Sequence, residues 1–107
     1  MDEEIIKLGG NIELSGFREI ERINNVVINK IVGSYARKFS EISTNFEKLQ
    51  INLKTIHDTG NSRKIEIHAK ASDNGKVFAS EVVDRNLYFA LDTVLKKVKA
   101  EMEKSKR

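Results

Sequence analysis

The chain has 107 residues, a formal net charge of +3, 39% hydrophobic and 33% charged residues, and no cysteine or proline. This length and apolar content predict one domain, residues 1–107, with a single core, and the absence of cysteine excludes disulfides, thiolate metal sites and cysteine nucleophiles. The start Met1–Glu4 is acidic where a secretory signal is basic, and no apolar run reaches the ~20 residues that span a bilayer, so we expect a cytoplasmic protein without a membrane partner.

The first half of the chain predicts a strand followed by a long helix. Residues 1–10 predict a flexible lead-in, and Asn11–Ser15 alternates in polarity like a short strand. A helix is predicted from about Arg18 to Ile42, because apolar residues recur there at helical spacing. The main stripe consists of Ile20, Ile23, Val27, Ile31, Tyr35 and Ile42, and it is widened by Val26, Ile28, Val32 and Phe39.

The second half predicts three strands and a terminal helix. Leu49–Leu53 and Ile65–Ala69 alternate like half-buried strands on either side of a turn at Asp58–Ser62, and Asn74-Gly75 predicts a hairpin leading into a fourth strand, Lys76–Val83. The helix begins near Leu87 with Asp84 as its N-cap, and residues 105–107 predict a frayed basic tail. Its core face carries Leu87, Ala90, Leu91, Val94, Val98 and Met102. The order β-α-β-β-β-α predicts an α+β two-layer sandwich, a four-stranded sheet with both helices on one face.

No catalytic constellation stands out in the sequence. His57 and His68 are expected on opposite faces of a hairpin, so we predict no metal site. Gly9-Gly10 lacks the further residues of a phosphate-binding loop. The acids near strands and turns form no recognisable dyad: Glu13, Glu66, Glu81 and Asp84. We therefore expect no enzyme, no cofactor and no small-molecule substrate.

Positive charge is concentrated at the end of the chain. Residues 94–107 hold six Lys/Arg and two Asp/Glu, whereas residues 1–93 hold thirteen and fourteen. On a helical wheel Lys97 and Lys104 share one direction, Lys96 points away from the core, and Lys99 flanks it. Lysines also suit the last turn of any helix, which accounts for Lys104 but less well for the three earlier lysines. This pattern favours binding to a polyanion.

Three further groups are candidates for partner binding. Lys30 and Arg37 share a direction on the first helix, and the open sheet face is expected to present Lys48, Lys54, Lys64 and Lys70. Phe89 points away from the core of the last helix. It is expected to stack on a base, to contact a protein, or to be covered by the lead-in.

From Asn11 to Lys104 the sequence resembles the ribosome hibernation-promoting factor and ribosome-associated inhibitor family. The resemblance is carried by the element order, by Asn86–Asp92 (Asn-Leu-Tyr-Phe-Ala-Leu-Asp) and by the lysine-rich continuation Val94–Val98. It implies binding to rRNA of the small ribosomal subunit at the decoding region, which holds idle ribosomes inactive. Family RNA-contacting bases fall on Lys97 and Lys104, and near Lys30, Arg37 and Lys38. Ala100 stands where many members have arginine.

The sequence therefore predicts a non-enzymatic, ribosome-associated RNA-binding protein that is a monomer or a weak dimer. The alternative is a protein-interaction module, as a homodimer or with another protein, that uses Phe89 and an exposed Val26 or Val77. A third reading, a free-standing binder resembling the double-stranded-RNA-binding domain, needs lysines at the start of its last helix. Here they begin nine residues after Leu87, which counts against it.

Overall fold

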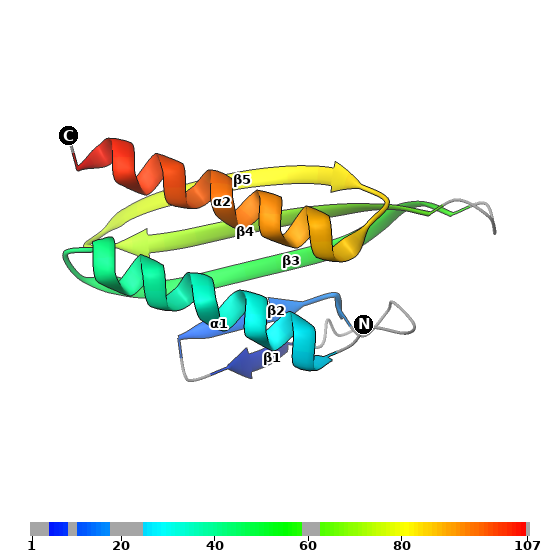
Figure 1. Cartoon of the computed structure of the whole chain (residues 1–107), viewed down its shortest axis with the longest axis horizontal. Helices are drawn as coiled ribbons and strands as arrows, with labels where there is room; N and C mark the ends of the chain where they lie inside the picture. Colours follow the sequence, from blue (N-terminus) through cyan, green and yellow to red (C-terminus); the bar gives the residue numbers. More distant parts are fainter. Residues whose placement is uncertain (1–4, 9–10, 18–24, 59–62, 107) are drawn as a thin grey trace.

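Five strands and two helices make up the part of the chain that the computed structural model describes, residues 5–8, 11–17, 25–58 and 63–106. Their order is β1 (Ile5–Leu8), β2 (Ile12–Ser15), α1 (Asn25–Ile42), β3 (Phe46–Asp58), β4 (Arg63–Asp73), β5 (Lys76–Asp84) and α2 (Leu87–Ser105). Both helices lie on one face of the sheet, side by side, and both begin at the same end of the molecule (Figure 1). The predicted α+β two-layer sandwich with both helices on one face is confirmed, but the described sheet has five strands and not the four that were predicted.

The sheet is mixed, with strand order β1-β2-β3-β4-β5. β2 and β3 are parallel, as expected for two strands joined through α1, and the other neighbours are antiparallel. One expectation for residues 1–10 is wrong: Ile5–Leu8 forms the edge strand β1, which pairs with β2, in a segment predicted to hold no element. This strand has only four residues and is stabilised by pairing with β2, so its own sequence does not predict a strand.

Local sequence explains how two of the strands end. Asn74 and Gly75 have φ of 52° and 85°, so the predicted hairpin turn between β4 and β5 is confirmed. Gly16, at φ 83°, ends β2 where a Cβ would lie 1.9 Å from the carbonyl oxygen of Leu53. Only glycine therefore allows β2 and β3 to run this close together at that point.

The N-cap of α2 is Asn86 and not Asp84, which corrects the prediction. The Asn86 side chain accepts a hydrogen bond from the backbone N–H of Phe89 at 2.9 Å. Asp84 lies two residues too early to reach that position. Instead it accepts a hydrogen bond from the backbone N–H of Asn86 at 2.9 Å, which fixes the turn that leads into the helix.

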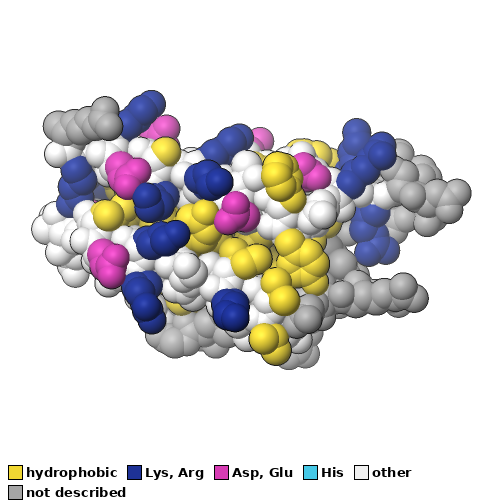
Figure 2. Space-filling view, in the orientation of Figure 1, with side chains coloured by type: hydrophobic (Ala, Val, Ile, Leu, Met, Phe, Trp, Pro, Cys, Tyr) yellow, Lys and Arg dark blue, Asp and Glu magenta, His cyan; other side chains and the backbone are white. Residues whose placement is uncertain are grey.

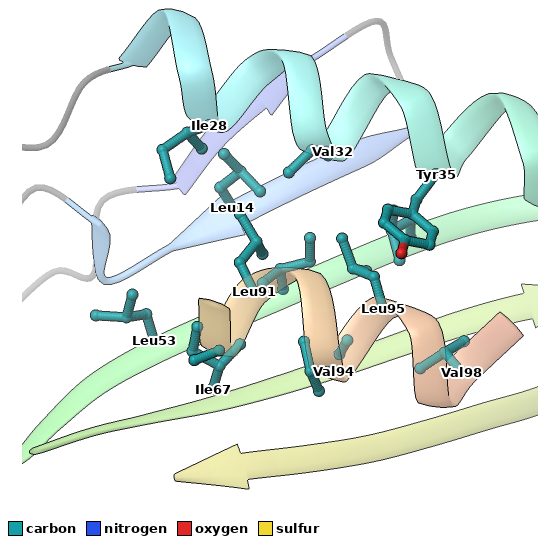
Figure 3. Close-up of a cluster of buried hydrophobic side chains, with 14 of the residues drawn as sticks. Leu14, Ile28, Val32, Tyr35, Leu53, Ile67, Leu91, Val94, Leu95 and Val98 are labelled. Carbon is teal, nitrogen blue, oxygen red and sulfur yellow. The ribbon is translucent and has the colours of Figure 1, made fainter. Parts of the chain in front are cut away.

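The core lies between the sheet and the two helices (Figure 3). As predicted, the inward residues of β3 and β4 and the core face of α2 are buried: Leu49, Ile51, Leu53, Ile65, Ile67, Leu91, Val94 and Val98. The stripe predicted on α1 is confirmed at Tyr35, but it is otherwise centred on residues that were predicted only to widen it. Val27 is 38% exposed and Ile31 is partly buried, whereas the buried residues of this helix are Ile28, Val32, Tyr35 and Phe39.

Two stripes compete on α1 because apolar residues occupy adjacent positions at both Val26–Ile28 and Ile31–Val32. Spacing alone therefore gave two solutions, and packing against β3 and α2 selects one. The first part of the predicted helix, with Ile20 and Ile23, and most of the predicted turn at Asp58–Ser62 lie outside the described residues.

The end of α2 is held against the turn between α1 and β3. Lys106 Nζ donates to Thr44 Oγ1 at 2.7 Å and lies 3.8 Å from Asp73 Oδ2. Asp73 is buried and accepts hydrogen bonds from the backbone N–H groups of Asn45 and Thr44 at 2.8 and 3.3 Å. The bond from Asn45, more than the neighbouring lysine charge, holds the pKa of this carboxyl below its usual value. Lys106 therefore has a structural contact, although it was predicted in a frayed tail.

Among the described helices, none has the length and apolar character to cross a lipid bilayer.

Candidate nucleic-acid interface

A shallow groove separates α1 from α2 on the outer side of the helical layer. Its volume is about 260 Å³, and it is lined by Lys30, Ile31, Ser34, Tyr35, Lys38 and Asp92. The buried Tyr35 closes its floor and donates a hydrogen bond from its hydroxyl to Asp92 Oδ1 at 2.9 Å. Burial, and then the hydrogen bond and charge of Asp92, raise the pKa of Tyr35 to about 12. The hydroxyl therefore stays protonated, and able to donate to Asp92, to a more alkaline pH than an ordinary tyrosine.

Basic side chains from both helices surround this link. Lys38 Nζ lies 4.8 Å above the centre of the Tyr35 ring, and Lys96 Nζ lies 3.7 Å from Asp92 Oδ2. The Lys96–Asp92 pair is largely exposed, at 71% and 46% of the two side chains, so water and salt weaken it. Lys30 and Lys38 make no ion pair within the described residues. Lys30, Lys38 and Lys96 are all exposed and therefore accessible to a phosphate.

Lys97 and Lys104 lie on the other flank of α2. Asp92 marks the side of the helix that faces α1, and at 100° per residue Lys97 and Lys104 point about 120–140° away from it. Both are exposed, and neither makes an ion pair in the part of the chain that is described. Their spacing of seven residues places them about 10 Å apart along the axis. The structure therefore does not gather them with Lys30 and Lys38, although all four lie on the same layer.

The remaining predicted bases of the helical layer differ in their surroundings. Lys99 is paired with Glu103 at 2.8 Å, and its side chain is only 29% exposed, so it is the least accessible of the α2 lysines. Arg37 is exposed on α1 without an ion pair among the described residues. Figure 2 shows Lys and Arg side chains spread over the helical face, with acidic side chains between them. We define the helical basic surface as Lys30, Arg37, Lys38, Lys96, Lys97 and Lys104.

The open face of the sheet carries charges of both signs. A hollow of about 840 Å³ is lined there by Glu13, Ser15, Gln50, Asn52, Lys54, His68, Lys70 and Glu81, among others. Lys48 pairs with Glu13 at 3.4 Å, whereas Lys54, Lys64 and Lys70 are exposed. The alternating burial of β4 confirms the predicted orientation of Lys64 and Lys70, and that of β3 confirms the orientation of Lys48 and Lys54. The acids interspersed among them make this face a weaker attractor of a polyanion than the helical basic surface.

Glu66, His68 and Glu81 form one further group on the open face. His68 Nε2 lies 3.1 Å from Glu66 Oε2, and His68 Nδ1 lies 3.5 Å from Glu81 Oε1. Three potential ligand atoms, one from each residue, lie within 4.8 Å of one another. The two carboxylates contact different nitrogens of the imidazole ring. Glu66 and His68 are neighbours on one face of β4, whereas Glu81 joins them only through the pairing of β4 with β5, which the sequence alone does not reveal.

Phe89 is 61% exposed near the start of α2, and Val26 is 75% exposed near the start of α1. Hydrophobic side chains are visible on the helical face near the end where both helices begin (Figure 2). The predicted exposure of Phe89, Val26 and Val77 is thus observed. Sequence reasoning missed the Tyr35–Asp92 link, because Tyr35 was assigned only an apolar role.

No protein-family model matches the chain, and no curated protein matches it. Among solved structures, its fold is similar to that of the Protein Y N-terminal domain of Thermus thermophilus. The TM-score is 0.52 at 18% sequence identity, over 82% of this chain and 90% of that chain. At this identity the likeness establishes the fold alone.

Proposed function

We propose that this protein is a non-enzymatic RNA-binding protein that occupies the decoding region of the small ribosomal subunit and holds idle ribosomes inactive. Two independent lines support the proposal. The sequence resembles the hibernation family in Asn86–Asp92, and the fold is similar to that of the Protein Y domain. The observation that carries the proposal is the helical basic surface, where five of the six bases make no ion pair within the described residues.

The proposed mechanism uses charge for affinity and shape for inhibition. Exposed lysines and Arg37 neutralise rRNA phosphates and release the counterions bound to them, which provides most of the binding free energy. The helices and sheet form a single packed body, so the protein fills a channel by its shape and does not need to read base edges. No reacting group is required, because a protein that occupies the channel excludes mRNA and tRNA from it.

Asp92, the last residue of the family-like stretch Asn86–Asp92, has a structural role in this mechanism. Its carboxylate accepts from the Tyr35 hydroxyl and lies near Lys96, so it links α2 to α1 and also places one base. The face of the Tyr35 ring makes a cation–π contact with the ammonium group of Lys38. The bases on the two helices are therefore held at a fixed separation, and a rigid surface loses less entropy when it binds.

Co-sedimentation with purified small subunits through a salt series tests the proposal. We expect stoichiometric binding at low salt, a steep loss of affinity as salt rises, and no comparable binding to large subunits. Binding that does not respond to salt, or that is equal on both subunits, would contradict the proposal.

A second candidate function is a protein-interaction module without an RNA role. The observation that favours it is the exposed Phe89, with Val26 at the same end of the helical layer. A partner that grips an exposed aromatic side chain would lose most of its affinity in Phe89→Ala and respond weakly to salt. RNA binding predicts the opposite pair of results, so the same salt series with Phe89→Ala separates the two functions.

A further inference from the structure

β5 is a long and regular edge strand. It pairs with β4 on one side only, over nine residues, at the opposite edge of the sheet from β1. Its register with β4 has no shift, whereas that between β3 and β4 has two. It contains no proline and none of its residues is fully buried. Natural edge strands usually carry a bulge, a proline or a central charge that prevents pairing with another strand. β5 has no bulge and no proline, and its central charge, Glu81, lies opposite Ala79 of the second copy in the register described below.

The sequence of β5 is complementary to itself in the antiparallel direction. It reads Lys-Val-Phe-Ala-Ser-Glu-Val-Val-Asp from Lys76 to Asp84. When two copies are paired about Ser80, Lys76 of each copy lies opposite Asp84 of the other. Val77 then lies opposite Val83, and Phe78 opposite Val82. This register produces two opposite-charge pairs and four apolar pairs, with no like charges opposed.

The faces of the sheet agree with this register. In the pairing with β4, Ser80 lies opposite Ala69 and Val82 opposite Ile67, both of which are buried. Phe78 and Val82 therefore face the helical layer, where they are only partly buried against the core. Val77 and Val83 face the open side and are 58% and 49% exposed. Opposite residues in the paired register have the same parity, so each face of one sheet continues into the same face of the other.

We propose that the chain forms a two-fold symmetric dimer by antiparallel pairing of β5 with β5 of a second copy, centred on Ser80. The contact extends over about 30 Å of strand and supplies partners for the outward N–H and C=O groups of both edges. It is isologous, so it closes at two copies, whereas pairing of β5 with the other edge, β1, would continue into a filament. This inference does not depend on ribosome binding.

Charge reversal across the strand tests the register. The full chain is studied by sedimentation equilibrium at concentrations up to about 1 mM, which reaches weak affinities. Lys76→Glu alone and Asp84→Lys alone each turn two attractions into two repulsions, so each is expected to raise the dimer Kd by roughly tenfold. The double variant K76E/D84K restores both pairs and is expected to return the Kd to near that of the parent. Circular dichroism confirms that each variant is folded.

Cysteine cross-linking provides a second measurement, because the parent chain has no cysteine. Ser80→Cys places two thiols opposite each other across the two-fold axis, at a Cα separation of about 4.5–5.5 Å that a disulfide spans. Val83→Cys is the matched control, since its two copies lie about 20 Å apart in this register. We expect rapid oxidation of Ser80→Cys to a covalent dimer and little of Val83→Cys. The proposal would be overturned if the chain stays monomeric at about 1 mM. It would also be overturned if neither charge reversal changes the dimer Kd, or if Ser80→Cys and Val83→Cys cross-link equally.

Discussion

Reversal of two charges on α2 tests which surface binds RNA. Lys97 and Lys104 are exposed and make no ion pair among the described residues, so Lys97→Glu with Lys104→Glu is expected to change the free energy of unfolding by no more than about 0.5 kcal/mol per site. Both side chains project from the same flank of α2. A single RNA backbone that follows this flank contacts both of them.

The size of the effect follows from the number of bases. If all six residues of the helical basic surface neutralise a phosphate, log Kd rises with log salt with a slope of about 4–5. Affinity then falls by roughly 300- to 2,000-fold between about 50 and 200 mM salt. Removal of two contacts lowers the slope by about 1.4–1.8, and the new glutamates repel the phosphates. We expect the double variant to lose measurable binding at physiological salt.

The assay is co-sedimentation with small subunits over a range of salt, with the slope measured at low salt where the variant still binds. The matched control reverses Lys64 and Lys70, which are also exposed and share one strand of the open sheet face. We expect this control to weaken binding only partly and to leave most of the slope. If the control pair is the more damaging, the protein binds RNA through its sheet and the reasoning from the helical layer is refuted.

Four other changes test the packing and chemistry of the fold. Leu91→Ala removes a fully buried side chain and is expected to cost about 2–5 kcal/mol in urea unfolding; a cost below about 1 kcal/mol would contradict the assigned core. Tyr35→Phe is expected to cost about 1 kcal/mol at neutral pH. Because the folded pKa is raised, this difference should disappear as pH rises from 10.0 towards about 12, and a difference that persists would exclude the link to Asp92. Asp73→Asn should lower stability near neutral pH, and the difference should shrink in acid as the native carboxylate, whose folded pKa is depressed below 3.8, becomes protonated; unfolding followed across acid pH checks the sign. His68→Gln, with or without a chelator, should leave thermal stability nearly unchanged, whereas a stoichiometric metal lost in the variant would show that a site exists at Glu66, His68 and Glu81.

Much of the fold follows from patterns that are local in sequence. The alternation in β3 and β4, the Asn74-Gly75 turn and the apolar face of α2 each depend on neighbouring residues, and each was predicted correctly. The core stripe of α1 was predicted only in part, because two adjacent stripes are similarly apolar and only contacts with β3 and α2 decide between them. The strand β1 was missed for a related reason, since its pairing with β2 determines its structure.

The candidate site was predictable in its residues but not in its geometry. The exposure of Lys97 and Lys104 follows from a helical wheel. Their separation from Lys30 and Lys38 depends on which side of α2 faces α1, which the sequence of either helix leaves open. The same holds for Tyr35 and Asp92, which are 57 residues apart and meet only across the groove. The self-complementarity of β5, in contrast, is present in the sequence but gains meaning only once β5 is known to be an edge.

The central claim is that the protein occupies the decoding region of the small subunit. Competition binding measures this most directly. Purified small subunits, either vacant or loaded with mRNA and tRNA, are titrated with the labelled protein at one fixed salt concentration. The account predicts tight binding to vacant subunits and release of mRNA and tRNA from loaded subunits in proportion to the protein bound. Equal affinity for vacant and loaded subunits, with mRNA and tRNA retained, would contradict it.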